Sequence, residues 1–302
     1  MGSNTQIKRI FTHFNVDLDA VTSVWFAREF MGARNAELVF VPANWDGTGM
    51  EDDDLALDIR AGGRGIKGEK HEDSTIGSCF FDLVATYAPN EDQGILYFLA
   101  DFVELQDSTG RAVEKLARAA NEFERATLDA VSINSVLRAL QATHPRNDAL
   151  VVERMSEIFS GMLENGRARQ RAKVEADRAE LIGDGLVAIS RDAKEFATNA
   201  ILFERGVRVI IYVDTHANGV ADIGVVREGS LTLRMDDPAL VAVIHAASEQ
   251  LGDGDGTWYA HPAGFLLAWG TRKAPATTPS RVRPEFLARA AVDLLATAST
   301  KQ

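Results

Sequence analysis

The segment from residue 12 to residue 20 places three hard metal ligands within a few positions. His13, Asp17 and Asp19 follow a β-branched apolar run and precede a stretch with helical spacing. An imidazole and carboxylate oxygens suit Mn²⁺ or a similar octahedral ion better than an ion that prefers thiolates. The spacing allows His13 and Asp17 to reach one cation, and Asp19 to reach a second one.

Helix capping is the simpler interpretation of the same acidic residues. An Asp directly before a helix accepts a hydrogen bond from the first turn, so Asp17 or Asp19 could be a cap. Capping accounts for one carboxylate, but for neither the other one nor His13. We therefore adopt the metal-site interpretation.

Further candidate ligands are expected at the ends of later elements. Asp58 ends a predicted strand over 55–59, His71 lies in the loop after it, and Asp107 comes near the end of a predicted helix. Taken singly, each is more typical of a structural or solvated residue. Together they would allow two cations about 3.5–4 Å apart, bridged by Asp58, to activate a water for in-line displacement at phosphorus.

A basic, glycine-rich loop lies between Asp58 and His71. Its cations and glycines alternate over 11 positions, and the cations are Arg60, Arg64, Lys67 and Lys70. Guanidinium groups and backbone amides can together surround an anion. A mobile solvent loop would explain the composition equally well, but the position between two candidate ligands favours phosphate binding.

These motifs resemble those of the DHH phosphoesterase superfamily, which is named for an Asp-His-His motif. The positions of its first motif are occupied here by His13, Asn15, Asp17, Asp19, Ala20 and Ser23. Asp58 resembles its second motif and Asp107 its fourth. Segments 58–63 and 106–110 look most like the melanocyte-proliferating-gene exonuclease branch.

The third motif departs from the family pattern. Where the family has Asp-His-His, this chain has Glu69-Lys70-His71-Glu72. If His71 corresponds to the metal-binding histidine, a second cation can be held. If it corresponds to the histidine that contacts substrate, Lys70 stands at the ligand position, and an ammonium group cannot ligate a metal.

The resemblance extends to the glycine-rich segment 252–265. The family's C-terminal domain contacts substrate phosphate through a glycine-rich loop with a histidine, and His261 and Gly264 stand in the corresponding order. Backbone amides freed by glycines can approach an anion, and Trp258 could stack on a base. Equally, this could be a loop before a buried strand at 265–269, with Trp258 in the core.

The composition indicates a folded chain of about two domains. The chain has 302 residues, with 46% hydrophobic and 25% charged. Its net charge of -12 argues against coating duplex nucleic acid. The single cysteine, Cys79, excludes an intrachain disulfide and suits a reducing compartment, so we expect a cytoplasmic protein. No run approaches the ~18 apolar residues of a spanning helix, so no membrane partner is expected.

Alternating strand and helix patterns would position the candidate ligands. The first third predicts strands over 7–12, 36–43 and 55–59, and a helix over 19–31. Such alternation favours a parallel sheet with helices on both faces and ligands at the carboxyl ends of its strands. Residues 77–181 are almost entirely helical in pattern.

The last third of the sequence has a pattern that is richer in predicted strands. It predicts strands over 183–190 and 207–213, a hairpin that joins 219–226 to 230–234, and a helix over 284–298. We predict an α/β fold, in which a doubly wound, mainly parallel sheet domain is joined by a helical connector to a smaller mixed α/β domain. The predicted domains are residues 1–148 (metal-binding and catalytic), 149–181 (connector) and 182–302 (substrate-binding), with the active site in the cleft.

The expected activity is Mn²⁺- or Mg²⁺-dependent phosphodiester hydrolysis of a short single-stranded oligonucleotide or a nucleotide, with two metal ions per chain. The expected catalytic residues are Asp17, Asp19 and His71. The expected metal ligands are His13, Asp17, Asp19, Asp58, His71 and Asp107. The expected substrate-binding residues are Arg60, Arg64, Lys67, Lys70, His261 and Gly264.

The alternative is a catalytically silent protein of the same fold that binds a nucleotide or a protein partner. The departure in the third motif motivates it. A homodimer is compatible with the sequence, which does not fix the oligomeric state.

Overall fold

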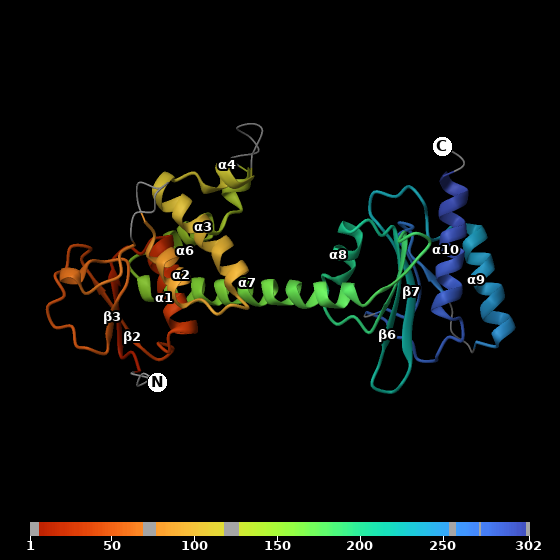
Figure 1. Ribbon diagram of the computed structural model, residues 1–302, viewed down its shortest axis with the longest axis horizontal. Coiled ribbons are helices and arrows are strands. Elements are labelled where there is room, and N and C mark those ends of the chain that lie inside the picture. Colours follow the sequence, from red (N-terminus) through yellow and green to blue (C-terminus); the bar gives the residue numbers. More distant parts are fainter. Residues whose placement is uncertain (1–5, 69–76, 118–126, 254–257, 272, 300–302) are drawn as a thin grey trace. The chain divides into compact units, whose positions relative to one another are not determined.

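The computed structural model describes residues 6–68, 77–117, 127–253, 258–271 and 273–299. The chain divides into two compact units, Met1–Arg167 and Ala168–Gln302, each with its own sheet (Figure 1). The mixed α/β class predicted from the sequence is confirmed. Among the described helices, none is both long enough and apolar enough to cross a membrane.

A parallel sheet with the strand order β2-β1-β3 lies in unit 1. Its strands are β1 (Arg9–His13), β2 (Glu37–Val41) and β3 (Asp54–Ala56). The predicted third strand is too long, because Asp58 adopts a φ of 55° that extended backbone does not allow. All three strands run in the same direction, so their carboxyl ends meet at one edge of the sheet.

Helices pack against one face of this sheet, where Ile10 joins their common core. The helices of unit 1 are α1 (Leu18–Phe30), α2 (Cys79–Tyr87), α3 (Gln93–Thr109), α4 (Ala112–Ala117), α6 (Ile133–Thr143) and α7 (Asp148–Asp177), which continues into unit 2. On the other face, Phe11 stacks on Trp45 with ring centroids 4.7 Å apart. The expectation of helices on both faces does not hold for the described residues, because the loop around Trp45 supplies the apolar cover there.

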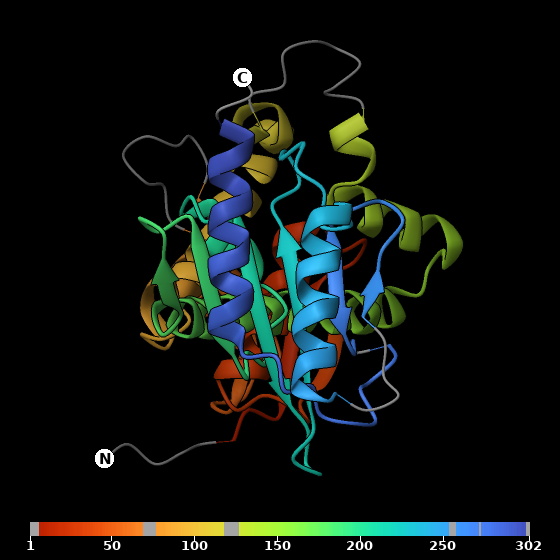
Figure 2. The same cartoon turned by 90° about the vertical axis from the view of Figure 1, so that its right-hand side faces the viewer.

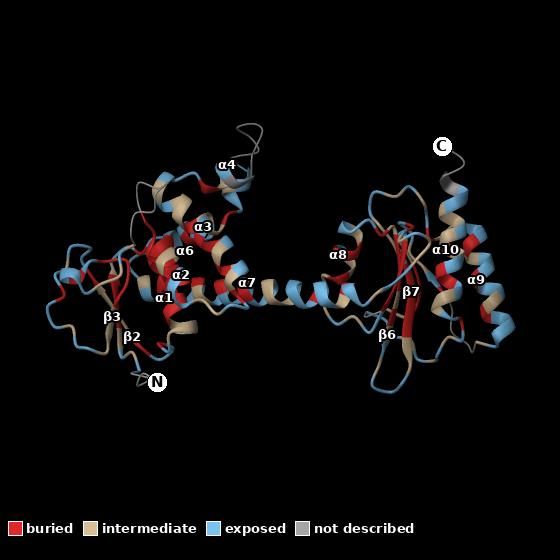
Figure 3. Ribbon diagram, in the orientation of Figure 1, coloured by how far each residue is buried: buried red, intermediate tan, exposed pale blue. Residues whose placement is uncertain are grey.

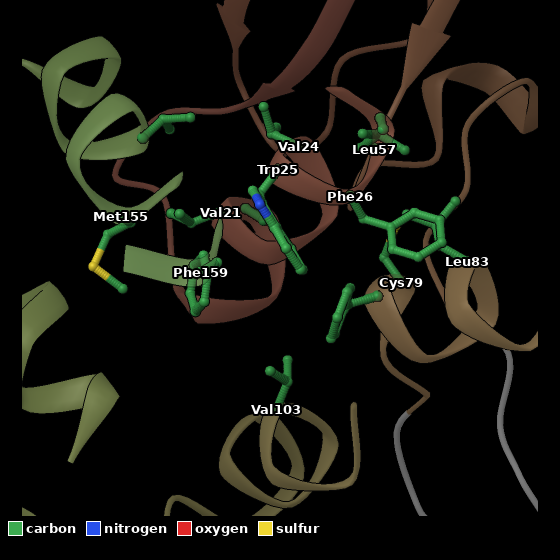
Figure 4. Close-up of a cluster of buried hydrophobic side chains, with 14 of the residues drawn as sticks. Val21, Val24, Trp25, Phe26, Leu57, Cys79, Leu83, Val103, Met155 and Phe159 are labelled. Atoms are coloured by element: carbon green, nitrogen blue, oxygen red, sulfur yellow. The ribbon is translucent and has the colours of Figure 1, made fainter. Parts of the chain in front are cut away.

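Trp25 lies in the centre of the unit 1 core (Figure 4). Its ring centroid lies 6.2 Å from that of Phe80 on α2 and 5.5 Å from that of Phe159 on α7. The indole Nε1 donates a hydrogen bond to Ser160 Oγ at 3.1 Å. Trp25 therefore ties α1 to two helices that are distant in the sequence.

Unit 2 contains a sheet with the strand order β4-β5-β6-β7-β9-β8, in which only β5 and β6 pair in parallel. Its strands are β4 (Glu180–Ile182), β5 (Val187–Arg191), β6 (Val209–Thr215), β7 (Ala221–Arg227), β8 (Tyr259–Ala260) and β9 (Leu266–Trp269). Figure 2 shows α9 (Pro238–Leu251) and α10 (Pro284–Ser299) side by side over one face. The other face packs on α8 (Thr198–Glu204), and the central strands are buried (Figure 3).

The hairpin predicted between 219–226 and 230–234 is wrong. β7 pairs with β6 on one side and with β9 on the other, so it offers no free edge to residues 230–234. Those residues form no strand. The turn of the observed hairpin lies before β7, where Gly219 has a φ of 79° and the His216 N–H donates to the Val220 carbonyl.

Replacing Trp25 by Ala should destabilise unit 1 by about 3–5 kcal/mol, because it leaves a cavity between three helices. Urea denaturation followed by circular dichroism measures the loss. Phe98→Ala on α3 is the matched control, since this ring is 72% exposed and its removal should change stability by at most about 0.5 kcal/mol. Equal losses in the two variants would contradict the central place of Trp25.

Candidate metal centre

His13, Asp17 and Asp58 bring three potential ligand atoms within 4.8 Å of one another. His13 is the last residue of β1, Asp17 precedes α1, and Asp58 follows β3. The three come together because β1 and β3 are parallel neighbours that end at the same edge. This edge is the place where the sequence predicts the chemistry.

The imidazole of His13 lies between the two carboxylates. Its Nε2 is 3.0 Å from Asp58 Oδ2 and 3.7 Å from Asp17 Oδ2, and its Nδ1 is 2.9 Å from the Phe14 carbonyl oxygen. The hydrogen bond to Asp58 raises the pKa of His13 to about 9, although burial opposes the shift. Without a metal the ring is therefore protonated at neutral pH, and both ring nitrogens donate.

Asp17 caps a helix, as one of the two interpretations predicts, and it also belongs to the group of three candidate ligands. Its Oδ1 accepts the Ala20 N–H at 3.0 Å and caps α1, while its Oδ2 faces His13. Burial and the charge of Asp58 raise the pKa of Asp17. One oxygen thus fixes the side chain, and the other is left for a ligand.

Asp19 lies outside this group and holds the beginning of α2. Its Oδ1 accepts hydrogen bonds from Ser78 Oγ and the Phe80 N–H, and its Oδ2 accepts one from the Cys79 N–H, each at 2.8 Å. The side chain is buried, and this burial together with the charge of Asp58 raises its pKa. Both carboxylate oxygens therefore already accept hydrogen bonds within the fold. The role of Asp19 as a ligand of a second cation stays a prediction.

Lys67 contacts Asp58 rather than standing apart as a phosphate ligand. Its ammonium group pairs with Asp58 Oδ1, so the carboxylate is held by Lys67 on one oxygen and by His13 on the other. Partial burial works against the charged ammonium, but the charge of Asp58 raises the pKa of Lys67 overall. Lys67 is therefore part of the centre.

Asp107 lies in the last turn of α3 and outside the three-residue group. Asp107 is exposed, but partial desolvation by neighbouring groups and the charges of Asp17 and Asp58 raise its pKa, while Lys67 and His13 lower it. The four groups whose charges act on Asp107 are those of the centre. Its role as a ligand stays a prediction.

The basic loop divides into residues with different surroundings. Arg64 donates to the carbonyl oxygens of Met50 and Glu51 at 2.8 and 2.9 Å, so its guanidinium ties two loops together. Arg60 is exposed and lines a cavity of about 600 Å³ together with Lys67. Lys70 and His71 lie outside the described residues.

Part of the predicted substrate loop of unit 2 lines a second cavity. His261 lines this cavity, of about 730 Å³, and its Nδ1 accepts the Ala263 N–H at 3.1 Å. Gly264 has a φ of 68°, and a Cβ there would lie 2.8 Å from the Arg234 guanidinium carbon. Glycine is thus required by the local backbone, and the substrate contacts of His261 and Gly264 stay predictions.

Trp258 belongs to the core and does not form a platform for a base. Its ring is buried, with its centroid 5.9 Å from that of Trp269, and its Nε1 donates to Ser248 Oγ at 3.3 Å. The core interpretation of this residue is confirmed.

Two hydrogen bonds that hold the ligand loop have no signal in the sequence. The Asn15 N–H donates to Asp148 Oδ2 at 2.9 Å, and Gln141 Nε2 donates to the Val16 carbonyl at 2.7 Å. Asn15 has a φ of 53°, and an Asn in the motif is a weak signal for this conformation. Nothing in the sequence links it to Asp148, which is 133 positions away.

No known protein family matches the sequence, and a search of curated proteins found no match. The chain is similar to the exonuclease RecJ bound to manganese, with 12% identity, 97% of this chain and 90% of that chain covered, and a TM-score of 0.27. RecJ from Thermus thermophilus in complex with Mn²⁺ has 11% identity, 97% and 52% coverage, and a TM-score of 0.28.

An exopolyphosphatase-related protein from Bacteroides fragilis has 11% identity, 97% and 93% coverage, and a TM-score of 0.26. At these identities and TM-scores, the likenesses establish neither a family nor an activity for this chain. The centre must be interpreted from its own residues.

Replacing Asp58 by Asn should lower the pKa of His13 from about 9 toward 6.5, because the interaction that raises it most is lost while burial still opposes the charged ring. NMR titration of the metal-free protein follows the ring. The raised pKa also implies that His13 stabilises the fold fully below pH 6.5 and that this contribution disappears as the pH rises through about 9. Asp101→Asn on α3 is the control, and a titration of His13 near pH 9 in D58N would contradict the assignment.

Replacing Asp19 by Asn should lower the free energy of unfolding by about 1–3 kcal/mol, because a buried backbone donor of α2 then faces an amide NH₂. Mn²⁺ affinity, measured by calorimetry, should stay within about threefold of the wild-type value. Lost metal binding at unchanged stability would instead assign Asp19 to a metal.

Proposed function

We propose that this protein is a metal-dependent phosphodiester hydrolase that acts on short single-stranded oligonucleotides or nucleotides. The observation that carries the proposal is the group formed by His13, Asp17 and Asp58 at the carboxyl edge of the sheet. The motif resemblance over His13–Asp19, Asp58 and Asp107 supports the same chemistry. The lone, buried Cys79 fits a reducing compartment, so the cytoplasm stays our expected location.

The donor set fits Mn²⁺ or Mg²⁺. One imidazole nitrogen and two carboxylate oxygens lie close enough for one ion, and the set contains no thiolate. A divalent ion held there would lower the pKa of a bound water and neutralise negative charge on a phosphoryl oxygen. His13 must lose its proton to solvent before its Nε2 can serve as a ligand.

The residues of the centre would orient the attacking water, and the proposed reaction conserves bonds, electrons and protons as follows. The oxygen of water forms a bond to phosphorus while the bond between phosphorus and the leaving oxygen breaks. The electron pair of the broken bond stays with the leaving oxygen. One proton of the water passes to solvent, and the leaving oxygen takes up a proton from solvent. The fixed Oδ1 of Asp17 keeps its Oδ2 in place throughout.

Substrate would approach through the cationic side of the centre. Arg60 and Lys67 line one cavity, and they can neutralise the anionic backbone of a nucleotide. We further propose that His261 and the backbone around Gly264 contact another phosphate of the substrate. The assignment of Asp19 and His71 to a second cation is a separate prediction from the sequence, and the number of Mn²⁺ ions bound per chain tests it.

A catalytically silent binding protein is the second candidate, and the charge balance of Asp58 favours it. Protonated His13 and Lys67 together compensate the buried carboxylate without a metal ion. Such a protein would hold a nucleotide or a protein partner on the same surface. The two candidates differ in whether Mn²⁺ binds and whether it supports hydrolysis.

Wild-type protein loaded with Mn²⁺ should hydrolyse bis(p-nitrophenyl) phosphate and short single-stranded oligonucleotides, and EDTA should abolish the activity. Asp17→Asn should lower kcat/KM at least about 100-fold, since it weakens a ligand of the ion. Asp101→Asn, a matched acidic change on α3, should retain the wild-type rate.

If the wild-type protein binds no Mn²⁺ and shows no metal-dependent hydrolysis of either substrate, the hydrolase proposal fails. Equilibrium dialysis with a labelled nucleotide then tests the silent binding protein. Retained nucleotide binding in Asp17→Asn would agree with that second candidate.

A further inference from the structure

Lys67 stands at the position where a second cation would neutralise Asp58. Asp58 is 2% exposed, with His13 on Oδ2 and the Lys67 ammonium on Oδ1. A carboxylate that bridges two metal ions offers one oxygen to each. Here the second oxygen already contacts a positive charge that belongs to the chain itself.

The backbone fixes Lys67 beside this carboxylate. The Asp58 N–H donates to the Ile66 carbonyl at 2.8 Å, and the Ile66 N–H donates to the Ala56 carbonyl at 2.9 Å. A Cβ on Gly65 would lie 2.0 Å from the Ile59 carbonyl oxygen, so this close packing of the loop requires glycine. Both backbone groups of Ile66, its N–H and its carbonyl, are thus hydrogen-bonded to the segment that carries Asp58.

The described residues around the centre form no second group of ligand atoms for another ion. Within the described parts of the chain, His13, Asp17 and Asp58 form the one group of three or more such residues close enough for a metal. Both oxygens of Asp19 accept hydrogen bonds from the beginning of α2. A second ion would have to displace the Lys67 ammonium and compete with these bonds.

We propose that the centre uses a single divalent ion, held by His13, Asp17 and Asp58, and that the ammonium of Lys67 takes the place of the second ion. This inference rests on the proposed hydrolase function. Lys67 keeps one N–H on Asp58 and directs the others to a non-bridging oxygen of the phosphoryl group. It is a catalytic residue, because it contacts the group on which negative charge develops.

The charge of the site then indicates a substrate class. Among the groups that would hold the ion or that pair with Asp58, two carboxylates balance one divalent ion and Lys67 adds one positive charge. The carboxylates of Asp19 and Asp107 lie outside this set of contacts. A phosphodiester carries one negative charge, whereas a terminal phosphate monoester carries up to two. The centre therefore matches a diester between nucleotides, and the half-exposed Lys67 reaches it from the cavity that Arg60 and Tyr87 also line.

Mn²⁺ titration and electron paramagnetic resonance test the stoichiometry in the wild-type protein. Calorimetry with metal-stripped protein should give one Mn²⁺ per chain. The resonance spectrum at saturation should be that of an isolated ion, without exchange coupling between ions. Two ions per chain with a coupled spectrum would overturn the inference, yet would leave the proposed hydrolase standing.

Lys67→Met separates the role of the ammonium from that of the metal. This variant should bind one Mn²⁺ at least as tightly as the wild type, since a nearby positive charge is removed. Its kcat on the diester should fall at least about 100-fold, and Lys67→Arg should restore part of the rate. Lys173→Met on α7 is the matched control for the loss of an exposed lysine and should keep the wild-type rate.

A wild-type kcat in Lys67→Met would overturn the role of Lys67, as would two bound Mn²⁺ ions in the wild type. Loss of Mn²⁺ binding in Lys67→Met would also overturn it, because Lys67 would then only position Asp58. The absence of metal-dependent hydrolysis in the wild type refutes the proposed function instead, so the two failures are distinguishable.

Discussion

The buried carboxylate of Asp58 is the constraint on which the site depends. A charged group at 2% exposure is costly unless opposite charges or donors surround it. His13 from β1 and Lys67 from the glycine-rich loop supply those charges, and Cys79 Sγ accepts the backbone N–H of Asp58 at 3.3 Å. Asp58 therefore joins a strand, a loop and the start of α2 into one arrangement.

Four acidic residues of similar appearance in the sequence have different functions in the structure. Asp17 caps α1 with one oxygen, Asp19 holds α2 with both, Asp58 is paired with two cations, and Asp107 is exposed at the end of α3. The difference follows from the number of backbone donors that each carboxylate meets. A carboxylate beside the N-terminus of a helix accepts hydrogen bonds from the N–H groups of its first turn, because these N–H groups have no partner within the helix and require acceptors when buried.

The sequence predicts those parts of the fold and the site that depend on local pattern. The strand at β1, the helix from Leu18 and the cluster of His13 with Asp17 follow from β-branched runs, helical spacing and hard ligands near a strand end. The parts that fail depend on contacts between distant segments. Trp45 replaces a helix on the second sheet face, and β9 takes the edge of β7 that residues 230–234 would need.

The difference between local pattern and distant contacts also applies to Lys67. The sequence predicts that Lys67 binds phosphate, whereas in the structure its ammonium group pairs with Asp58. Its spacing in a glycine-rich loop shows only that a cation is available, and the pairing of Ile66 with the segment 56–58 decides which anion it meets. These two functions are compatible, because an ammonium group has three donors and Asp58 occupies one. An ammonium group that the loop already holds in place also costs less entropy on substrate binding than an ion recruited from solution. The proposed site, with one recruited ion and one built-in charge, is consistent with these constraints on Lys67.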